Sequence, residues 1–222
     1  MPISDNPILT VDQTSFLLRF RASPLCDIFY LTGGTALSAY FLQHRLSEDL
    51  DFFTEGDVGL EEVLSFVKSL PGLTDVQYER KYDRKIFLLR YPDARIMKVE
   101  FTKYPFSRLE TGPVIEGIQI DSLRDILVNK LMAMTDRRDA KDYVDLYCAL
   151  RKYPELDLQM LVEQTELKFG VKGVHHILRG RYLEPLPAPG VLKMRAGLDQ
   201  EELARFFADQ AREWIVRSTE EP

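Results

Sequence analysis

LTGGTALSAYFLQHRLSEDLDFFT, residues 31–54, contains the pattern from which the fold can be inferred. Its first residue ends a short apolar run over 26–31, which predicts a buried strand that stops at Gly33 and Gly34. TALSAYFLQ then predicts a helix, and in residues 49–54 acidic and apolar side chains alternate with the period of a strand. The stretch therefore predicts a strand, a glycine turn, a helix and a second strand, in that order.

The remaining sequence divides into a mixed α/β part and a helical part. In the first part we expect helices over 7–23 and 60–70, and strands over 76–81, 85–91, 95–102 and 113–120. In the second part we expect helices over 122–135, 139–152, 157–168 and 199–217. The pattern predicts an α+β protein with an α/β core over 1–120 and a helical C-terminal domain over 121–222.

The composition is that of an ordinary globular protein. The chain has 222 residues, of which 45% are hydrophobic and 29% charged, and a formal net charge of −6; these values exclude disordered and fibrous classes and disfavour general nucleic-acid binding. Two cysteines are too few for a disulfide scaffold and favour buried thiols in a reducing cytoplasm. No apolar window has the length of a membrane span and no signal peptide is evident, so we expect a cytoplasmic protein without a membrane partner. The aromatic residues lie in periodic segments and are interpreted as core.

Two acids on the 49–54 strand are candidate metal ligands. Asp49 and Asp51 lie two residues apart, so a strand turns both carboxylates to one face. Adjacent carboxylates repel each other unless a cation lies between them, and Mg²⁺ takes oxygen ligands from one or two carboxylates plus substrate phosphates. The alternative is a solvated strand face with two unrelated acids, but Leu50 and Phe52 indicate a core strand, where unpaired acids are costly.

Glu100 is the third candidate ligand. It lies in the strand expected over 95–102. If that strand neighbours the one with Asp49 and Asp51, three carboxylates could hold two Mg²⁺ ions about 3.5–4 Å apart, an arrangement suited to in-line nucleotidyl transfer. The alternative is an exposed strand acid paired with Lys98.

Three further features could bind a phosphate or orient a substrate. Gly33 and Gly34 would let a ligand approach the backbone ahead of a helix, although a tight turn alone could also need them. Lys130 falls within an apolar helix stripe, where it either snorkels to water or has an anionic partner, in the functional interpretation a nucleotide phosphate. Asp142 lies at the edge of the apolar face of the next helix, with Asp145 further out; its alternative role is that of an acid favoured by the helix dipole.

The order and spacing of these residues resemble the AbiEii-type nucleotidyltransferases, toxin components of abortive-infection type toxin–antitoxin pairs in the DNA polymerase β-like superfamily. The resemblance covers about residues 28–150. The matching residues are Gly33, Gly34, Thr35, Leu37, His44, Arg45, Ser47, Asp49, Leu50, Asp51 and Phe52 in the first motif, Glu100 in the second, Lys130, Leu131 and Ala133 in the third, and Arg138, Asp139, Asp142, Asp145 and Leu146 in the fourth. The second-motif acid is Glu where Asp is expected, which metal binding tolerates.

The resemblance implies a nucleotidyltransferase-like mixed sheet with flanking helices, and an enzyme that transfers NMP from an NTP to an acceptor hydroxyl with Mg²⁺. It implies nucleotide binding by Gly33, Gly34, Thr35, Arg45, Ser47 and Lys130, metal binding by Asp49, Asp51 and Glu100, and a catalytic set of Asp49, Asp51, Glu100, Lys130 and Asp142. Ser47 alternatively serves as a cap. The resemblance also implies an RNA acceptor, with tRNA as the first candidate, and a cognate antitoxin protein as partner.

Two other functions stay open. A small-molecule acceptor, as in antibiotic-modifying enzymes, would need no basic surface, whereas RNA needs a stripe of cations. Candidates for that stripe are Arg80, Lys81, Arg84, Lys85 and residues 179–181. The third hypothesis is an inactive module that binds a nucleotide or an antitoxin, and the intact acids and lysine argue against it.

Overall fold

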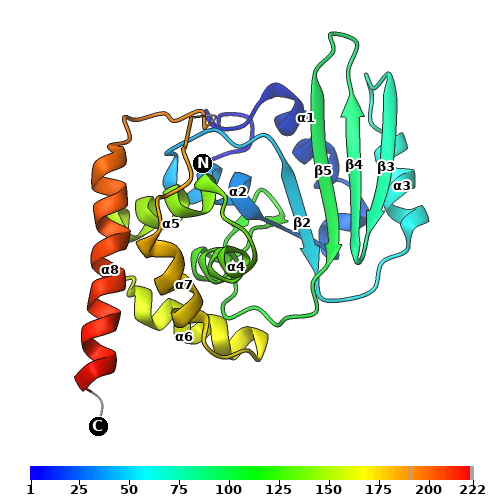
Figure 1. The fold of residues 1–222 in the computed structure, drawn as a ribbon. Helices are drawn as coiled ribbons and strands as arrows, with labels where there is room; N and C mark the ends of the chain where they lie inside the picture. Colours follow the sequence, from blue (N-terminus) through cyan, green and yellow to red (C-terminus); the bar gives the residue numbers. More distant parts are fainter. Residues whose placement is uncertain (191, 221–222) are drawn as a thin grey trace. The chain divides into compact units, whose positions relative to one another are not determined.

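The computed structural model describes residues 1–190 and 192–220, and its contacts divide the chain into two compact units, Met1–Leu123 and Arg124–Pro222 (Figure 1). The first unit contains a mixed sheet with helices, and the described residues of the second are helices and their connections. The expected α+β class is confirmed: a mixed sheet with flanking helices is followed by a helical C-terminal region.

A five-stranded sheet with the order β1-β2-β5-β4-β3 forms the centre of the first unit. Its strands are β1 (Tyr30–Thr32), β2 (Leu50–Thr54), β3 (Asp75–Lys81), β4 (Arg84–Arg90) and β5 (Ile96–Lys103). β2 and β5 are parallel, and the other neighbouring pairs are antiparallel. The sheet therefore brings β2 beside β5, although β3 and β4 come between them in the sequence.

One face of the sheet is covered by two helices, α1 (Val11–Phe20) and α3 (Leu60–Lys68). Phe52 of β2 and Phe101 of β5 are fully buried on this side and stack with ring centroids 5.1 Å apart. Phe16 of α1 contacts Phe52 at 5.7 Å and meets Phe66 of α3 edge to face at 5.4 Å. Because successive strand residues point to opposite faces, the residues next to Phe52 in β2 and next to Phe101 in β5 point to the other side of the sheet.

Two segments of the first unit differ from the expected strands. Residues 26–31 form the 3-10 helix η1 (Pro24–Asp27) and then the short β1; Pro24 begins the helical turn because its ring fixes a φ close to the helical value. Residues 113–120 form a hairpin of β6 (Val114–Ile115) and β7 (Ile118–Gln119) instead of one strand. Glu116 and Gly117 both have positive φ, as a tight hairpin turn requires.

The helix expected over 35–43 begins two residues earlier than the sequence suggests. It starts as α2 (Gly33–Ala36) and continues as the π-helix η2 (Leu37–Leu42). It ends at Gln43, which takes the left-handed conformation with φ 56°. The two glycines are therefore part of the first turn of the helix rather than a loop ahead of it.

The described helices of the second unit are α4 (Leu123–Asp136), which starts at the last residue of the first unit, α5 (Ala140–Lys152), α6 (Leu158–Phe169), α7 (Val174–Leu183) and α8 (Gln200–Glu220). The sequence prediction lacks α7, because two histidines and Gly180 are weak helix formers. Its buried residues Val174, Leu178 and Tyr182 recur at every fourth position, a signal that was available. Tyr182 packs on Phe207 of α8, with ring centroids 4.7 Å apart.

None of the described helices is long and apolar enough to cross a membrane. Cys26 and Cys148 are both half-buried rather than buried as expected. The thiol of Cys26 donates to the Gly117 carbonyl at 3.4 Å.

Candidate active site

The side of β2 and β5 opposite the covering helices carries the three candidate acids. Leu50 and Phe52 are fully buried on the helix-covered side, so the side chain of Asp51 points to the other side, and Asp49 follows the same alternation just ahead of the strand. β2 and β5 pair with Asp51 directly opposite Glu100. The condition set for Glu100, that its strand neighbours the strand of Asp49 and Asp51, is met, and the acids share one face.

Two protein cations lie among these acids. Lys98 Nζ is 3.2 Å from Asp49 Oδ2 and 3.6 Å from Glu100 Oε2. Arg84 of β4 donates to both carboxylate oxygens of Glu100, and the Thr102 hydroxyl donates to Glu100 Oε1 at 3.1 Å. The buried carboxylate of Glu100 is therefore surrounded by donors, whereas the side chain of Asp49 is 41% exposed.

The pKa values of Glu100 and Lys98 follow from these neighbours. Burial raises the pKa of Glu100, but the hydrogen bonds and charge of Arg84 outweigh it and hold the pKa below the usual value of a glutamic acid. Burial lowers the pKa of Lys98, but the charges of Asp49 and Glu100 outweigh it, so that the pKa is raised. Both groups are charged at neutral pH, and Glu100 in this arrangement is a weak base.

Gly33 and Gly34 lie against the acids and against two other polar side chains. Gly33 has a φ of +71°, and a Cβ added to it would lie 2.2 Å from Asp51 Oδ2, so a side chain fits neither the conformation nor the space. A Cβ on Gly34 would lie 2.9 Å from Arg45 Nη2 and 2.9 Å from Ser47 Oγ. The glycine turn therefore places bare backbone beside a carboxylate, a guanidinium and a hydroxyl.

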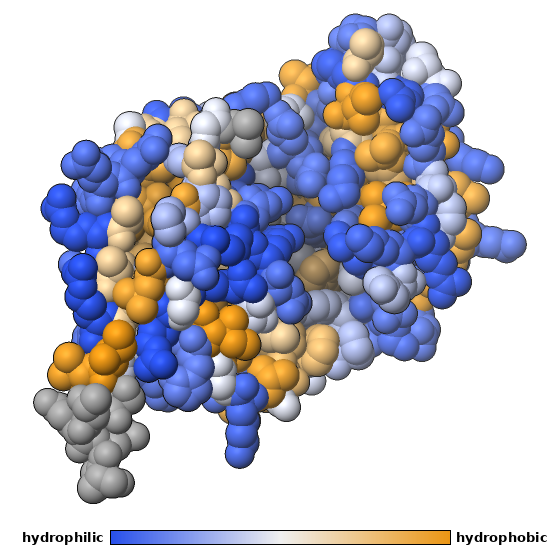
Figure 2. Space-filling model, viewed as in Figure 1, coloured by the Kyte–Doolittle hydropathy of each residue, from blue (hydrophilic) through white to orange (hydrophobic). Residues whose placement is uncertain are grey.

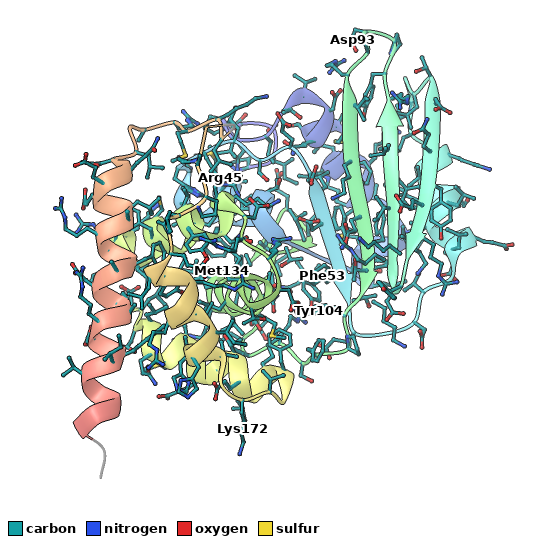
Figure 3. All side chains as sticks on the ribbon, viewed as in Figure 1. Arg45, Phe53, Asp93, Tyr104, Met134 and Lys172 are labelled. Carbon is teal, nitrogen blue, oxygen red and sulfur yellow. The ribbon has the colours of Figure 1, made fainter. Side chains whose placement is uncertain are left out.

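The loop that leads into β2 is held by buried hydrogen bonds. Arg45, labelled in Figure 3, is 3% exposed, and its Nη1 donates to the Leu46 carbonyl at 3.0 Å. Thr35 is fully buried and its hydroxyl donates to the Asp49 carbonyl. Gln13 of α1, which the sequence did not single out, donates to the Ser47 carbonyl at 2.8 Å. In this arrangement the Thr35 hydroxyl positions the backbone of Asp49 and is not presented to a ligand.

A pair of aromatic rings lies beyond Asp51. Phe53 points to the same side of β2 as Asp51, and its ring stacks on that of Tyr104 with centroids 4.4 Å apart (Figure 3). Both residues are half-buried, so the interpretation of the aromatic residues as core is wrong for this pair. The alternation that places Asp51 on this side could have identified Phe53, whereas Tyr104 follows the end of β5 and had no sequence signal.

Lys130 and Asp142 meet inside the second unit. Lys130 Nζ lies 3.0 Å from Asp142 Oδ1 and 2.7 Å from Asp145 Oδ2, and the lysine side chain is 8% exposed. Arg137, which is 51% exposed, donates to Asp142 Oδ2 through Nε at 2.9 Å. Burial raises the pKa of Asp142, but the charges of Lys130 and Arg137 outweigh it, so that the pKa is lowered.

This cluster corrects two interpretations of the sequence. Lys130 does not snorkel to water, since its ammonium group is buried between two carboxylates. Asp145 does not lie further out than Asp142, because both side chains are fully buried. Residues three apart share a helix face, and this spacing was the signal that could have placed Asp145 beside Asp142.

No group of three or more Asp, Glu, His or Cys side chains within the described ranges lies close enough together to hold a metal ion as they stand. The acids nevertheless fit a divalent cation, because they already gather around a positive group, the ammonium of Lys98. Mg²⁺ needs one or two carboxylates in addition to water and phosphate, which Asp49 and Asp51 can supply. Glu100 is held by Arg84 in this arrangement.

The structure thus forms two groups of candidate residues. The first unit brings together Gly33, Gly34, Arg45, Ser47, Asp49, Asp51 and Glu100, with Thr35 behind them. The second unit brings together Lys130 and Asp142, and adds Arg137 and Asp145.

Two solved structures from Helicobacter pylori have a similar fold. One is the crystal structure of JHP933, with a TM-score of 0.61, 21% sequence identity and coverage of 89% of this chain and 86% of that one. The other is a putative nucleotidyltransferase, with a TM-score of 0.60, 24% identity and coverage of 89% of both chains. At these identities the likeness concerns the fold, and that fold is the one of a nucleotidyltransferase.

The chain belongs to the AbiEii family, described as "Nucleotidyl transferase AbiEii toxin, Type IV TA system", whose sequence model matches residues 15–217. An uncharacterized protein of Aquifex aeolicus strain VF5, aq_aa25, is 33% identical over 165 residues, which are 72% of this chain and 76% of that protein. The resemblance found in the motifs is therefore confirmed, and the protein is a nucleotidyltransferase. Membership of this toxin family implies an NTP as substrate and an antitoxin as partner.

Proposed function

We propose that the protein transfers NMP from an NTP to a hydroxyl group of an RNA, with tRNA as the first candidate, and that it acts as the toxin of an abortive-infection type toxin–antitoxin pair. The observation that carries the transfer chemistry is the position of Asp51. Its carboxylate lies against the bare backbone of Gly33 and directly opposite Glu100 on the neighbouring strand. A triphosphate lying on the glycine turn would have its reacting phosphate beside these acids.

In this proposal the nucleotide is held by the turn and by the side chains beside it. Gly33 and Gly34 let the triphosphate approach the backbone closely. The guanidinium of Arg45 and the hydroxyl of Ser47, both next to Gly34, neutralise and orient phosphate oxygens. Thr35 contributes through the Asp49 carbonyl that it binds.

Asp49 and Asp51 would hold Mg²⁺, with Glu100 completing the site for a second ion after Arg84 withdraws. When bound, Mg²⁺ neutralises the charge that develops on the phosphates. The side chain of Asp49 is 41% exposed and that of Glu100 is 3% exposed, so Asp49 is the better placed of the two to reach a ligand from solvent. The cations Lys98 and Arg84, once displaced, remain beside the site as positive charge for the triphosphate.

We also propose the roles that the family motifs imply for Lys130 and Asp142: the lysine contacts nucleotide phosphates, and the aspartate orients the nucleotide or the acceptor. The two side chains meet in one buried ion pair, with Lys130 Nζ 3.0 Å from Asp142 Oδ1, so the proposed roles would act from the same place. Arg137, the exposed cation of the same cluster, is a further candidate for the phosphate contact.

In the transfer itself, the acceptor oxygen attacks the α-phosphorus in line and the bond from that phosphorus to the bridging oxygen breaks. Pyrophosphate leaves with the electron pair of that bond, and the acceptor proton passes to a carboxylate or to water. The residues of the chain contribute by positioning the reactants and neutralising charge.

The test is transfer of label from each α-³²P-NTP in turn, with Mg²⁺, to total cellular RNA. We expect label on a small RNA, and a loss of at least about a hundredfold in Asp51→Asn, because the variant removes a charge at the reacting phosphate. Asp93→Asn is the matched control, since Asp93 is an exposed acid in the turn between β4 and β5, labelled in Figure 3.

Three outcomes would contradict the proposal. Label on small molecules alone would indicate an antibiotic-type acceptor, and NTP binding without any transfer would indicate an inactive binding module. Unchanged transfer in Asp51→Asn would remove Asp51 from the mechanism.

A further inference from the structure

Cations gather at the turn that joins β3 to β4. Residues 80–85, Arg-Lys-Tyr-Asp-Arg-Lys, contain four cations and one acid, in a chain with a net charge of −6. Arg84 binds Glu100. Within the described part of the chain, Arg80, Lys81 and Lys85 have no carboxylate partner. We call residues 80–85 the basic turn.

The basic turn starts at the candidate active site and continues around the end of the β3–β4 ribbon. Lys81 lies opposite Arg84, and Arg80 lies opposite Lys85. Because opposed residues share a side of the sheet and successive residues alternate, Lys81 accompanies Arg84 on the side of the acids, whereas Arg80 and Lys85 point to the other side. Arg84 contacts Glu100, so the positive charges are continuous with the acids.

A groove and an exposed ring accompany these charges. A cavity of about 200 Å³ beside the turn has charged, aromatic and apolar walls. Its lining residues are Asp57, Val58, Leu60, Tyr78, Arg80, Tyr82, Asp83, Lys85 and Lys103. Asp57 is paired with Lys103 at 2.7 Å, and the cations exceed the acids by one. Tyr82 is 86% exposed and has a φ of 55°, a conformation that residues other than glycine seldom adopt. On the face that Figure 2 shows, hydrophilic residues predominate around this end of the ribbon.

We propose that the basic turn binds the acceptor RNA, with its cations on the phosphates of a single-stranded segment and Tyr82 stacked on an unpaired base. Cations without a carboxylate partner, next to an exposed aromatic ring, are the combination that single-stranded nucleic acid requires. An acidic protein would use the cations but would leave the ring unexplained. The inference rests on the proposed RNA acceptor and adds the surface by which this chain would reach it.

The test uses fluorescence anisotropy with a 5′-labelled single-stranded RNA oligonucleotide and the full chain. The variant is Arg80→Gln/Lys81→Gln/Lys85→Gln, which leaves the acids and Arg84 intact. The charge-matched control is Arg19→Gln/Lys68→Gln/Lys172→Gln, which removes three cations outside the turn. A second variant, Tyr82→Ala, tests the stacking separately.

We expect the turn variant to bind RNA at least about tenfold more weakly near 0.1 M salt, with a shallower salt dependence by about 0.7 per lost phosphate contact. Tyr82→Ala should weaken binding between about fivefold and a hundredfold through loss of one stacked base. The control should bind RNA like the unmodified chain, and all variants should bind NTP equally well by calorimetry.

Equal RNA affinity in the turn variant and its control, or no RNA binding by the unmodified chain, would overturn the inference. Competition with the RNA by polyglutamate, an acidic polypeptide, at equal charge concentration would also overturn the inference. If the turn variant loses RNA binding although the unmodified chain transfers no label, the binding surface stands and the proposed transfer to RNA fails.

Discussion

A side chain added at position 33 would enter the space that the Asp51 carboxylate fills. The contact of Gly33 with Asp51 therefore links backbone conformation to the candidate chemistry. We predict that Gly33→Ala costs about 1–2 kcal/mol of stability, because an L-residue is strained at positive φ, and lowers transfer by about a hundredfold, because the Cβ displaces a carboxylate at the reacting centre. The contact is the 2.2 Å approach of an added Cβ to Asp51 Oδ2. Thermal unfolding and the labelling reaction measure the two effects.

Gly72→Ala is the control that separates the effect of backbone strain from the effect of displacing the Asp51 carboxylate. Gly72 has a φ of +79°, and an added Cβ would meet nothing within 4 Å. It should lose similar stability and keep its activity. Equal activity losses in the two variants would show that the Gly33 contact has no special role.

At the scale of elements, α4 and α5 are joined by an ionic cluster in which Lys130, Asp142 and Asp145 are buried and Arg137 is exposed. We predict that Lys130→Met destabilises the protein by about 3–5 kcal/mol, because it leaves a buried carboxylate without its cation. Adding Asp145→Asn restores the charge balance, so the double variant should recover about 1–3 kcal/mol. Urea denaturation of the single and double variants gives these values, and strictly additive losses would contradict the coupling.

The elements also show where local sequence is a sufficient guide. β2, β4 and β5 were predicted to within a residue or two at each end, because each carries an alternating or continuous apolar pattern that ends at a turn. α7 was missed, since its apolar spacing is interrupted by poor helix formers. The strand expected over 26–31 is shortened to β1, because the turn η1 that begins at Pro24 takes the first two of these residues.

For the whole molecule, ligand binding should appear as a change in stability. An NTP with Mg²⁺ at about a hundred times its Kd should add about 2.7 kcal/mol, which corresponds to a rise in Tm of about 5–10 °C for a chain of this size. EDTA should remove most of the rise by removing the metal, and Asp51→Asn should remove it by removing a ligand. Differential scanning calorimetry of the variant beside Asp93→Asn tests this, and a rise that persists in EDTA would contradict a metal requirement.

Local spacing in the chain was enough to establish the class of fold, the motif residues and the family, because a glycine turn, an Asp-x-Asp strand and an inward lysine are each encoded over a few residues. Which of these residues meet one another depends on packing between distant segments. The pairing of β2 with β5 places Asp51 opposite Glu100, and the neighbouring β4 brings Arg84 onto that carboxylate. Asp145 beside Lys130 and the stacked rings of Phe53 and Tyr104 were likewise set by packing. The period of a strand or helix shows which face a side chain occupies, but the partner across from it is fixed only when the elements come together.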